Sequence, residues 1–357
     1  MHNRSYLFYP YTDKSYGFIR GLIDLELKFD VVSPLGYGLN NKDLSYVVNR
    51  KENGKLIRDV HNVDFNQYDA IILSNHINSL MEKELKILIS SAEENKLEII
   101  NLCKEFNVDA LAFEEESKDN LTKNELDEMV NRIEELGLPY YESTKPIILV
   151  GGILETIDDF NVSLRLKLEF ENQGYKVELI TNEKDAVFLK CLNYPESFMS
   201  NIGAEKQIYD LNRYIQAIET LKNSDVIILH IPQGMIRYNN YFSNAFGTYA
   251  FIVGQSLKAD YFILNLVNSV IDDRYFEKLD EYFSIVLGIK IDLINMTNSH
   301  YENLSDRIDK LRHPFYVDES EIDSTIDCYR GKYTLKNLNY SKDILEVVYR
   351  IIRKLEQ

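Results

Sequence analysis

The fold is decided by the stretch Ile147-Ile148-Leu149-Val150-Gly151-Gly152, an apolar run that ends in two glycines. A run this short and this apolar is typical of a strand buried on both faces of a parallel sheet. A segment of helical period follows over 161–174, and the next apolar run spans 175–180. This order of strand, loop, helix and strand predicts a parallel α/β unit, with its glycine-rich loop at the edge where such sheets bind ligands.

Further segments of the same kind extend this unit toward the C-terminus. The pattern predicts strands over 225–231, 261–267 and 283–289, helices over 206–222, 245–257 and 342–356, and a polar loop over 232–240. We therefore place one α/β domain over 146–357.

The N-terminal part shows the same alternation. The pattern predicts strands over 6–9, 29–32, 69–74 and 97–102, and amphipathic helices after the first strand and over 82–94. These segments predict a Rossmann-like domain over 1–105. The acidic stretch 106–145 contains a charged helix and is interpreted as a linker, with a surface helix of the first domain as the alternative. The expected fold class is therefore α/β, with two domains of mainly parallel sheets flanked by helices.

The composition excludes several classes of function. A chain of 357 residues is long enough for two domains with full cores. Its 40 Lys and Arg against 57 Asp and Glu give a net charge of −17, which disfavours binding to nucleic acid or to an anionic membrane. Cys103, Cys191 and Cys328 form no CxxC pair, so a disulfide framework or a zinc knuckle is not expected and a reducing cytoplasm fits best. We expect neither a secretion signal nor a membrane span.

The first glycine-rich loop lies where a nucleotide hydrolase has its phosphate-binding loop. Such a loop needs the pattern G-x-x-x-x-G-K-[ST], because its glycines let backbone N–H groups approach the phosphates and its Lys neutralises them. Counting from Gly152 puts Ile157, Asp158 and Asp159 at the places of the second Gly, the Lys and the Ser or Thr. Asp158 and Asp159 are interpreted as residues that cap the following helix. In the alternative, they bind a cation or a basic group together with Glu155.

The second loop is rich in amide groups. Its polar residues before Gly247 are Gln233, Arg237, Asn239, Asn240 and Asn244. Amides of this kind can recognise a peptide backbone, although a loop of Asx turns is the alternative. His230 lies near the place where a nucleotide hydrolase has a metal-binding Asp, and a strand-end histidine without a ligand role is the alternative.

The first domain offers the turn 33–38, which contains Gly36 and Tyr37 and could cover a ligand. It lacks G-x-G-x-x-G after its first strand, so dinucleotide binding has little support. The chain has no G-x-S-x-G, H-E-x-x-H or EF-hand pattern, and its cysteines are expected to be inert buried thiols. The candidate ligand-binding residues are therefore Gly151, Gly152, Glu155, Asp158, Asp159, His230, Gln233, Gly234, Arg237, Asn239, Asn240, Gly36 and Tyr37; no catalytic residue and no metal ligand are assigned.

Several of these segments resemble one family, the clostridial peptide maturation system proteins. The segments that carry the resemblance are 147–152, Gly174-Tyr175-Lys176-Val177, Ile231-Pro232-Gln233-Gly234-Met235, Tyr238-Asn239-Asn240, Phe246-Gly247, Leu7-Phe8-Tyr9-Pro10, Val32-Ser33-Pro34 and Gly36-Tyr37-Gly38. The resemblance implies a Rossmann-like domain joined to a domain derived from a P-loop fold. It also implies a place in gene clusters for ribosomally made, bacteriocin-like peptides, beside a radical S-adenosylmethionine maturase.

Two functions follow from this resemblance and from the altered loop. The first is an accessory protein that binds the precursor peptide or the maturase, and the acidic surface suits a basic partner. The second is an enzyme that uses a nucleotide or a divalent metal ion at the altered loop. The missing Lys favours the first, so no cofactor is predicted. We also expect two copies of the chain to pair, because P-loop-derived domains often associate across their ligand loops.

Overall fold

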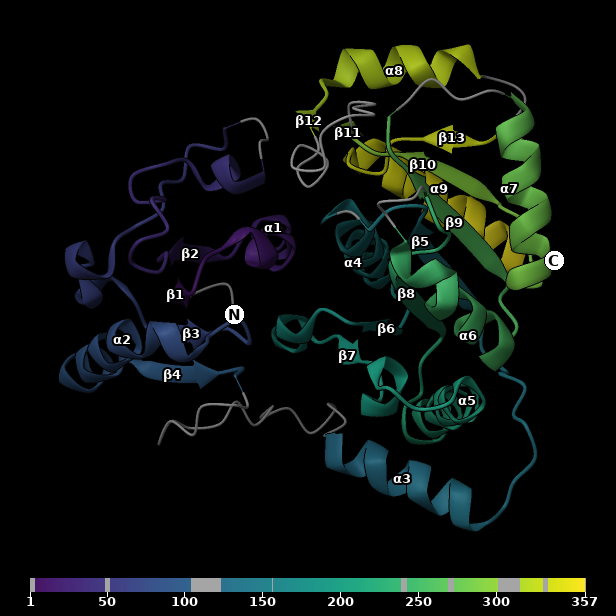
Figure 1. Ribbon diagram of the computed structural model, residues 1–357, viewed down its shortest axis with the longest axis horizontal. Helices are drawn as coiled ribbons and strands as arrows, with labels where there is room; N and C mark the ends of the chain where they lie inside the picture. Colours follow the sequence, from purple (N-terminus) through teal and green to yellow (C-terminus); the bar gives the residue numbers. More distant parts are fainter. Residues whose placement is uncertain are drawn as a thin grey trace. The chain divides into compact units, whose positions relative to one another are not determined.

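The computed structural model describes residues 4–48, 52–103, 123–155, 157–238, 243–268, 273–300, 315–329 and 333–356 (Figure 1). The chain divides into two compact units. Unit 1 comprises residues 1–117, 183–190 and 313–316, and unit 2 comprises 118–182, 191–312 and 317–357. The sequence-based boundaries of 1–105, 106–145 and 146–357 stay a prediction.

Unit 1 contains a parallel sheet of four strands in the order β2-β1-β3-β4. Its strands are β1 (Ser5–Tyr9), β2 (Lys28–Val31), β3 (Ala70–Leu73) and β4 (Glu98–Asn101), and unit 1 also includes β12 (Phe315–Tyr316). The chain builds β2 on one side of β1 and then β3 on the other. The strand order therefore reverses between β1 and β3. At the carboxyl ends of these two strands, the N–H of Ser74 donates to the carbonyl of Tyr9.

Two helices cover opposite faces of this sheet. Helix α1 (Tyr16–Asp24) packs Phe18 against Phe8, with ring centroids 5.3 Å apart. Helix α2 (Glu82–Asn95) buries its apolar face in a cluster with Leu7 and Tyr9, which alternate with Phe8 along β1. Such opposite coverage is what right-handed crossovers produce when the strand order reverses.

Six short 3-10 helices complete the described part of unit 1: η1 (Asp13–Ser15), η2 (Leu44–Val48), η3 (Val60–Asn62), η4 (Phe65–Gln67), η5 (Ser79–Met81) and η6 (Lys184–Leu189). Helix η6 is distant in sequence from the rest of the unit. The Phe188 ring makes edge contacts with Tyr6 and Phe18, which ties η6 into the core of unit 1.

Unit 2 is built on a parallel sheet of seven strands in the order β13-β10-β9-β5-β8-β6-β7. The strands are β5 (Ile147–Gly152), β6 (Val177–Thr181), β7 (Leu192–Asn193), β8 (Val226–Gly234), β9 (Tyr261–Leu266), β10 (Leu293–Met296) and β13 (Leu335–Lys336); β11 (Ser299–His300) lies outside this sheet. The central strand β5 is buried along its whole length, as the apolar run at 147–152 predicts.

Helices cover both faces of the sheet. They are α3 (Lys123–Glu135), α4 (Ile157–Asn172), α5 (Ala204–Leu221), α6 (Thr248–Ser256), α7 (Asp273–Val286), α8 (Glu319–Cys328) and α9 (Ser341–Leu355), with the 3-10 helices η7 (Glu196–Met199) and η8 (Asn244–Gly247). Helix α4 packs beside α9, whereas α5 contacts α6 and α6 contacts α7. Helix α5 buries Leu211, Ile215 and Ile218 at the spacing of one helix face.

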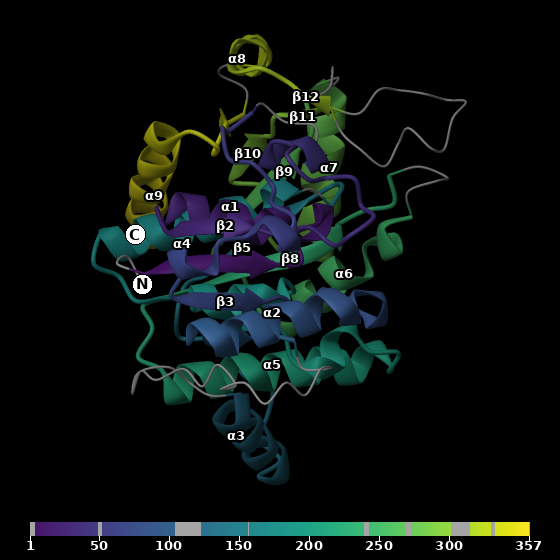
Figure 2. The same cartoon turned by 90° about the vertical axis from the view of Figure 1, so that its left-hand side faces the viewer.

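Helix α3, from the stretch interpreted as a linker, packs against α5 in unit 2 and crosses it (Figure 2). Its Leu126 and Ile133 are buried in the core cluster of that unit. The packing of these two side chains therefore assigns the helix to unit 2 rather than to the first domain.

The structure confirms the α/β class, with two mainly parallel sheets flanked by helices. One strand prediction is wrong, because residues 283–286 form the end of helix α7 and the next strand is β10. Phe276, Leu279 and Phe283 are buried at helical spacing, whereas Ile285 is 75% exposed. The polar loop expected from Pro232 also begins later, because β8 continues to Gly234. Among the described residues, no helix is both long enough and apolar enough to cross a membrane.

Candidate functional site

The candidate site of unit 2 lies where β5 ends between its two neighbours. Gly152 is in register with Gly234 on β8 and with Asn265 on β9. The carbonyl of Gly152 accepts from the N–H of Met235, and the N–H of Ile153 donates to the carbonyl of Asn265. Three sequence-distant segments therefore meet at this carboxyl edge, which is the ligand-binding edge of open α/β sheets.

The chain fills this edge with its own side chains. A Cβ atom on Gly152 would lie 2.9 Å from both carboxylate oxygens of Asp159, so only glycine allows that carboxylate to approach the backbone. A Cβ atom on Gly234 would lie 2.2 Å from the side chain of Asn244. At Gly151 the corresponding space is occupied by the Met235 sulfur. The glycines that would let a phosphate approach thus accommodate protein atoms instead.

Asp158 and Asp159 lie in the first turn of α4 and are fully buried. Asp159 Oδ1 accepts from Asn265 Nδ2 at 2.8 Å, and Asp158 Oδ2 accepts from Ser299 Oγ at 3.1 Å. Carboxylates at a helix N-terminus interact favourably with the positive end of the helix dipole, which is also where a phosphate would bind. The acidic pair therefore occupies the anion position of this loop.

Asn265 extends the contact of Asp159 across the sheet. Its Oδ1 accepts from Asn295 Nδ2 at 2.8 Å, and Asn295 Oδ1 accepts from the N–H of Leu338 at 2.8 Å. Asp159, Asn265 and Asn295 are all buried. A buried hydrogen-bonded chain of this kind fixes its members in place, because loss of one member leaves another without a partner.

A left-handed turn lies beside the loop. Asn244, Ala245, Phe246 and Gly247 all have positive φ, at 49°, 45°, 56° and 72°. Asn244 Nδ2 holds the turn by donating to the carbonyls of Ile153 and Ile236, at 2.8 and 2.7 Å. Phe246 is 68% exposed at the tip of this turn. Consecutive non-glycine residues in this region are strained, and such strain is concentrated at functional sites.

The other candidates in this region lie as follows. Gln233 has a φ of 60° and is half-buried, and Arg237 is exposed. Glu155 is exposed, and its carboxylate accepts from the backbone N–H of Gln233. Asn239 and Asn240 lie outside the described residues.

His230 is separate from this loop surface, in the interior of the sheet. It is 5% exposed, and its Nδ1 is 2.9 Å from Thr181 Oγ1. Burial lowers the pKa of His230 to about 4, so the imidazole is neutral at pH 7. Its contacts are those of a hydrogen-bonded core residue.

The turn that carries Gly36 and Tyr37 belongs to unit 1 and is exposed. It is anchored by Glu84, whose carboxylate accepts from the N–H of Leu35 at 2.9 Å. All three cysteines are free thiols; the expectation of buried thiols is confirmed for Cys103 and Cys191 and is wrong for Cys328, which is exposed near the end of α8.

Unit 1 contains a further group that was not predicted from the sequence: the potential ligand atoms of His76, Glu183 and Asp185 all lie within 4.8 Å of one another. His76 follows β3, whereas the two carboxylates flank the start of η6. No spacing pattern signals this group, because its members come from distant parts of the chain.

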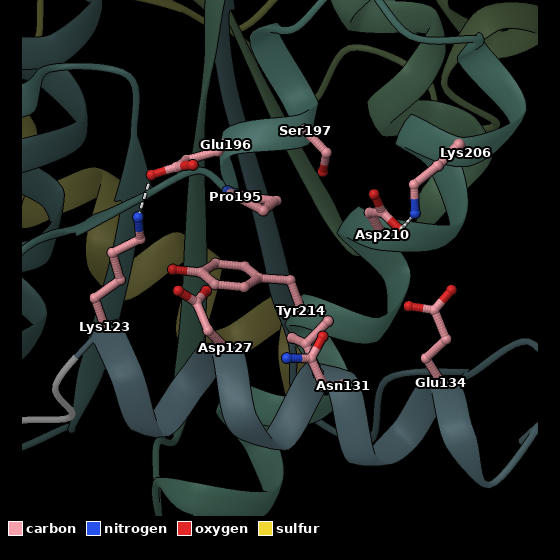
Figure 3. A pocket seen from close by; sticks show the side chains of 11 residues that line it. Lys123, Asp127, Asn131, Glu134, Pro195, Glu196, Ser197, Lys206, Asp210 and Tyr214 are labelled. Carbon is pink, nitrogen blue, oxygen red and sulfur yellow. Dashed lines mark hydrogen bonds and ion pairs between the residues drawn. The ribbon is translucent and has the colours of Figure 1, made fainter.

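A surface pocket of about 320 Å³ in unit 2 is a further candidate (Figure 3). It is lined by Lys123, Asp127, Val130, Asn131, Glu134, Pro195, Glu196, Ser197, Lys206, Asp210 and Tyr214. Lys123 pairs with Glu196, and Lys206 pairs with Asp210 at 3.1 Å, so two of its four carboxylates already have a lysine partner.

The fold and this edge define the class: an α/β protein of two units with parallel sheets, in which two buried carboxylates occupy the start of the helix after the central strand of unit 2. No family model and no curated protein matches the sequence.

Solved structures with a similar fold include a DUF1611 family protein from Anabaena variabilis. The match covers 98% of this chain and 100% of that chain, with a TM-score of 0.51 and 11% identity. Cobyrinic acid a,c-diamide synthase from Mycobacterium smegmatis matches 60% of this chain and 96% of its own, at a TM-score of 0.33 and 11% identity. A nucleotide-binding protein in complex with ADP from Archaeoglobus fulgidus matches 67% of this chain and 95% of its own, at a TM-score of 0.34 and 9% identity. At these identities the likeness concerns the fold alone.

Proposed function

We propose that this chain is an accessory binding protein in the maturation of a ribosomally made peptide, and that unit 2 binds the precursor peptide without hydrolysing a nucleotide. The observation that carries the proposal is the Asp159 carboxylate, which lies against Gly152 and is hydrogen-bonded to Asn265. A polyphosphate at this loop would meet two buried carboxylates where it needs a Lys.

The exposed part of the same edge suits a peptide. Phe246 provides a large apolar side chain at the tip of a turn whose backbone is fixed by Asn244. A rigid aromatic side chain is a favourable anchor, because little conformational entropy is lost when a partner covers it. The net charge of −17 favours a basic precursor over an acidic one.

Thermal stability of the purified chain tests the proposal. The ligands are the precursor peptide encoded beside it, a panel of nucleotides with Mg²⁺, and S-adenosylmethionine. A ligand that binds only the native state raises the melting temperature. We expect an increase with the peptide and none with the nucleotides.

Phe246→Ala should weaken peptide binding at least about tenfold, as expected for loss of an aromatic anchor. The matched control is Leu345→Ala, which truncates another exposed apolar side chain of unit 2, on α9. Peptide affinity that is equal in both variants would contradict the assignment of Phe246.

The alternative function is a nucleotide- or metal-dependent enzyme that uses the altered loop. It predicts a nucleotide-induced increase in melting temperature that Asp158→Ala abolishes. That result, without any effect of the peptide, would replace the accessory role with the enzymatic one.

A further inference from the structure

We propose that unit 1 binds a divalent transition-metal ion through His76 Nε2 and the carboxylates of Glu183 and Asp185. This site lies in unit 1 and is independent of the peptide-binding function proposed for unit 2.

The strand order of unit 1 reverses between β1 and β3, and the crevice beyond the carboxyl ends of such strands is the usual ligand site of an open α/β sheet. His76 comes three residues after the end of β3. The group thus lies at the edge where this sheet architecture places a ligand.

Asp185 is fully buried, and hydrogen bonds hold its carboxylate in a fixed orientation. One of its oxygens accepts from Ser74 Oγ, and the other accepts from the N–H and the side-chain amide of Asn75, at 2.8 and 3.2 Å. Ser74 Oγ also accepts from the N–H of His76 at 3.1 Å. Metal-ligating carboxylates are typically held by hydrogen bonds of this kind, and Oδ2 retains a lone pair for a metal ion.

One ring nitrogen of His76 is unsatisfied among the described residues. Its Nε2 atom is buried and has no hydrogen-bond partner within the described part of the chain, and Glu183 Oε1 is 4.0 Å away. A buried polar atom without a partner is rare and requires an explanation such as an ion.

The donor set indicates the class of metal. One imidazole nitrogen with two carboxylate oxygens suits Zn²⁺ or Mn²⁺ better than Mg²⁺, which prefers oxygen ligands. Ligands about 2.1 Å from a tetrahedral ion lie about 3.4 Å from one another, so the three donors need to move together by about an ångström. Three protein ligands leave one position for water or an external ligand.

Titration of the chelator-treated, full-length chain with Zn²⁺, followed by calorimetry, tests the site. We expect one ion per chain in the wild type. His76→Ala and Glu183→Gln should each weaken binding at least about tenfold. The controls His61→Ala and Cys328→Ser, which change an exposed histidine of unit 1 and the exposed thiol, should leave the affinity unchanged.

Co²⁺ provides a second readout, because its visible absorption reports the coordination geometry. His76→Ala should change that spectrum, whereas His61→Ala should not. If His76→Ala fails to fold, the conservative Glu183→Gln variant decides. Absence of Zn²⁺ binding in the wild type, or wild-type affinity in the folded ligand variants, would overturn the proposal; Mg²⁺ binding as tight as that of Zn²⁺ would overturn the assignment to a transition metal.

Discussion

Replacement of Asp159 by Ala tests whether the filled phosphate position stabilises unit 2. Asp159 and Asn265 are 1% and 2% exposed, and their side chains share a hydrogen bond of 2.8 Å. The variant removes the acceptor and leaves Asn265 Nδ2 buried without it. The change therefore opens the chain of contacts that continues through Asn295 to the backbone of Leu338.

The size of the effect follows from this geometry. A buried hydrogen bond to a charged group contributes about 1.5–3 kcal/mol to the free energy of unfolding. We therefore expect Asp159→Ala to lower that free energy by about 2–3 kcal/mol, which corresponds to a decrease of about 6 °C in melting temperature for a unit of this size. Asp159→Asn keeps the shape of the side chain and an oxygen acceptor, so it should cost less than Asp159→Ala.

Urea unfolding of the wild type, Asp159→Ala, Asn265→Ala and the double variant measures the interaction directly. The coupling free energy from this cycle should lie between about 1 and 3 kcal/mol, as for neighbours in one buried network. Additive effects, with a coupling below about 0.3 kcal/mol, would refute the argument. The stability of unit 2 would then not depend on the contact that fills its phosphate position.

The remaining predictions concern a close approach of two helices, a buried imidazole and an exposed aromatic. A Cβ atom on Gly254 would lie 2.2 Å from the carbonyl oxygen of Val286, so Gly254→Ala should lower the free energy of unfolding by about 1–3 kcal/mol in urea titrations. The control Gly203→Ala should change that free energy little, because the space around its Cβ position is open. The His230 pKa of about 4 in the folded chain lies below the value near 6.5 in the unfolded chain, so the unfolded state takes up the proton first as the pH is lowered. The free energy of unfolding of the wild type should therefore fall by up to about 3 kcal/mol between pH 6.5 and pH 4. His230→Gln should remove this part of the pH dependence, and identical profiles would contradict it. Phe246→Ala should leave the free energy of unfolding within about 0.5 kcal/mol of the wild type, because the side chain is exposed.

Hydrophobic patterning predicted most strands of both sheets because these strands are buried on both faces. Residues 147–150 and 261–264 are continuous apolar runs in the sequence and are buried at every position. The apolar run at 283–289 begins instead with the last turn of helix α7, so its apolar residues do not form a strand. Phe283 faces the core from helix α7, and Ile285 faces solvent, so length and composition alone do not distinguish this helix end from a strand.

The position of the two acidic residues in the altered loop could be predicted from the sequence, but the residues that they contact could not. The order of strand, loop and helix, together with the count from Gly152, placed Asp158 and Asp159 at the start of a helix, where the structure has them. Their partners Ser299 and Asn265 come from distant segments and follow from no local pattern. The same holds for Asp185, which lies 110 positions from the Asn75 that donates to it.

Asp158 and Asp159 also meet a local requirement of the strand, loop and helix to which they belong. The N-terminus of α4 needs an anion or acceptors near its free N–H groups, whether or not a nucleotide is present. Asp158 and Asp159 supply negative charge from within the chain, so the local requirement of the fold is met without a ligand. The fold therefore constrains the charge at this position but not its source.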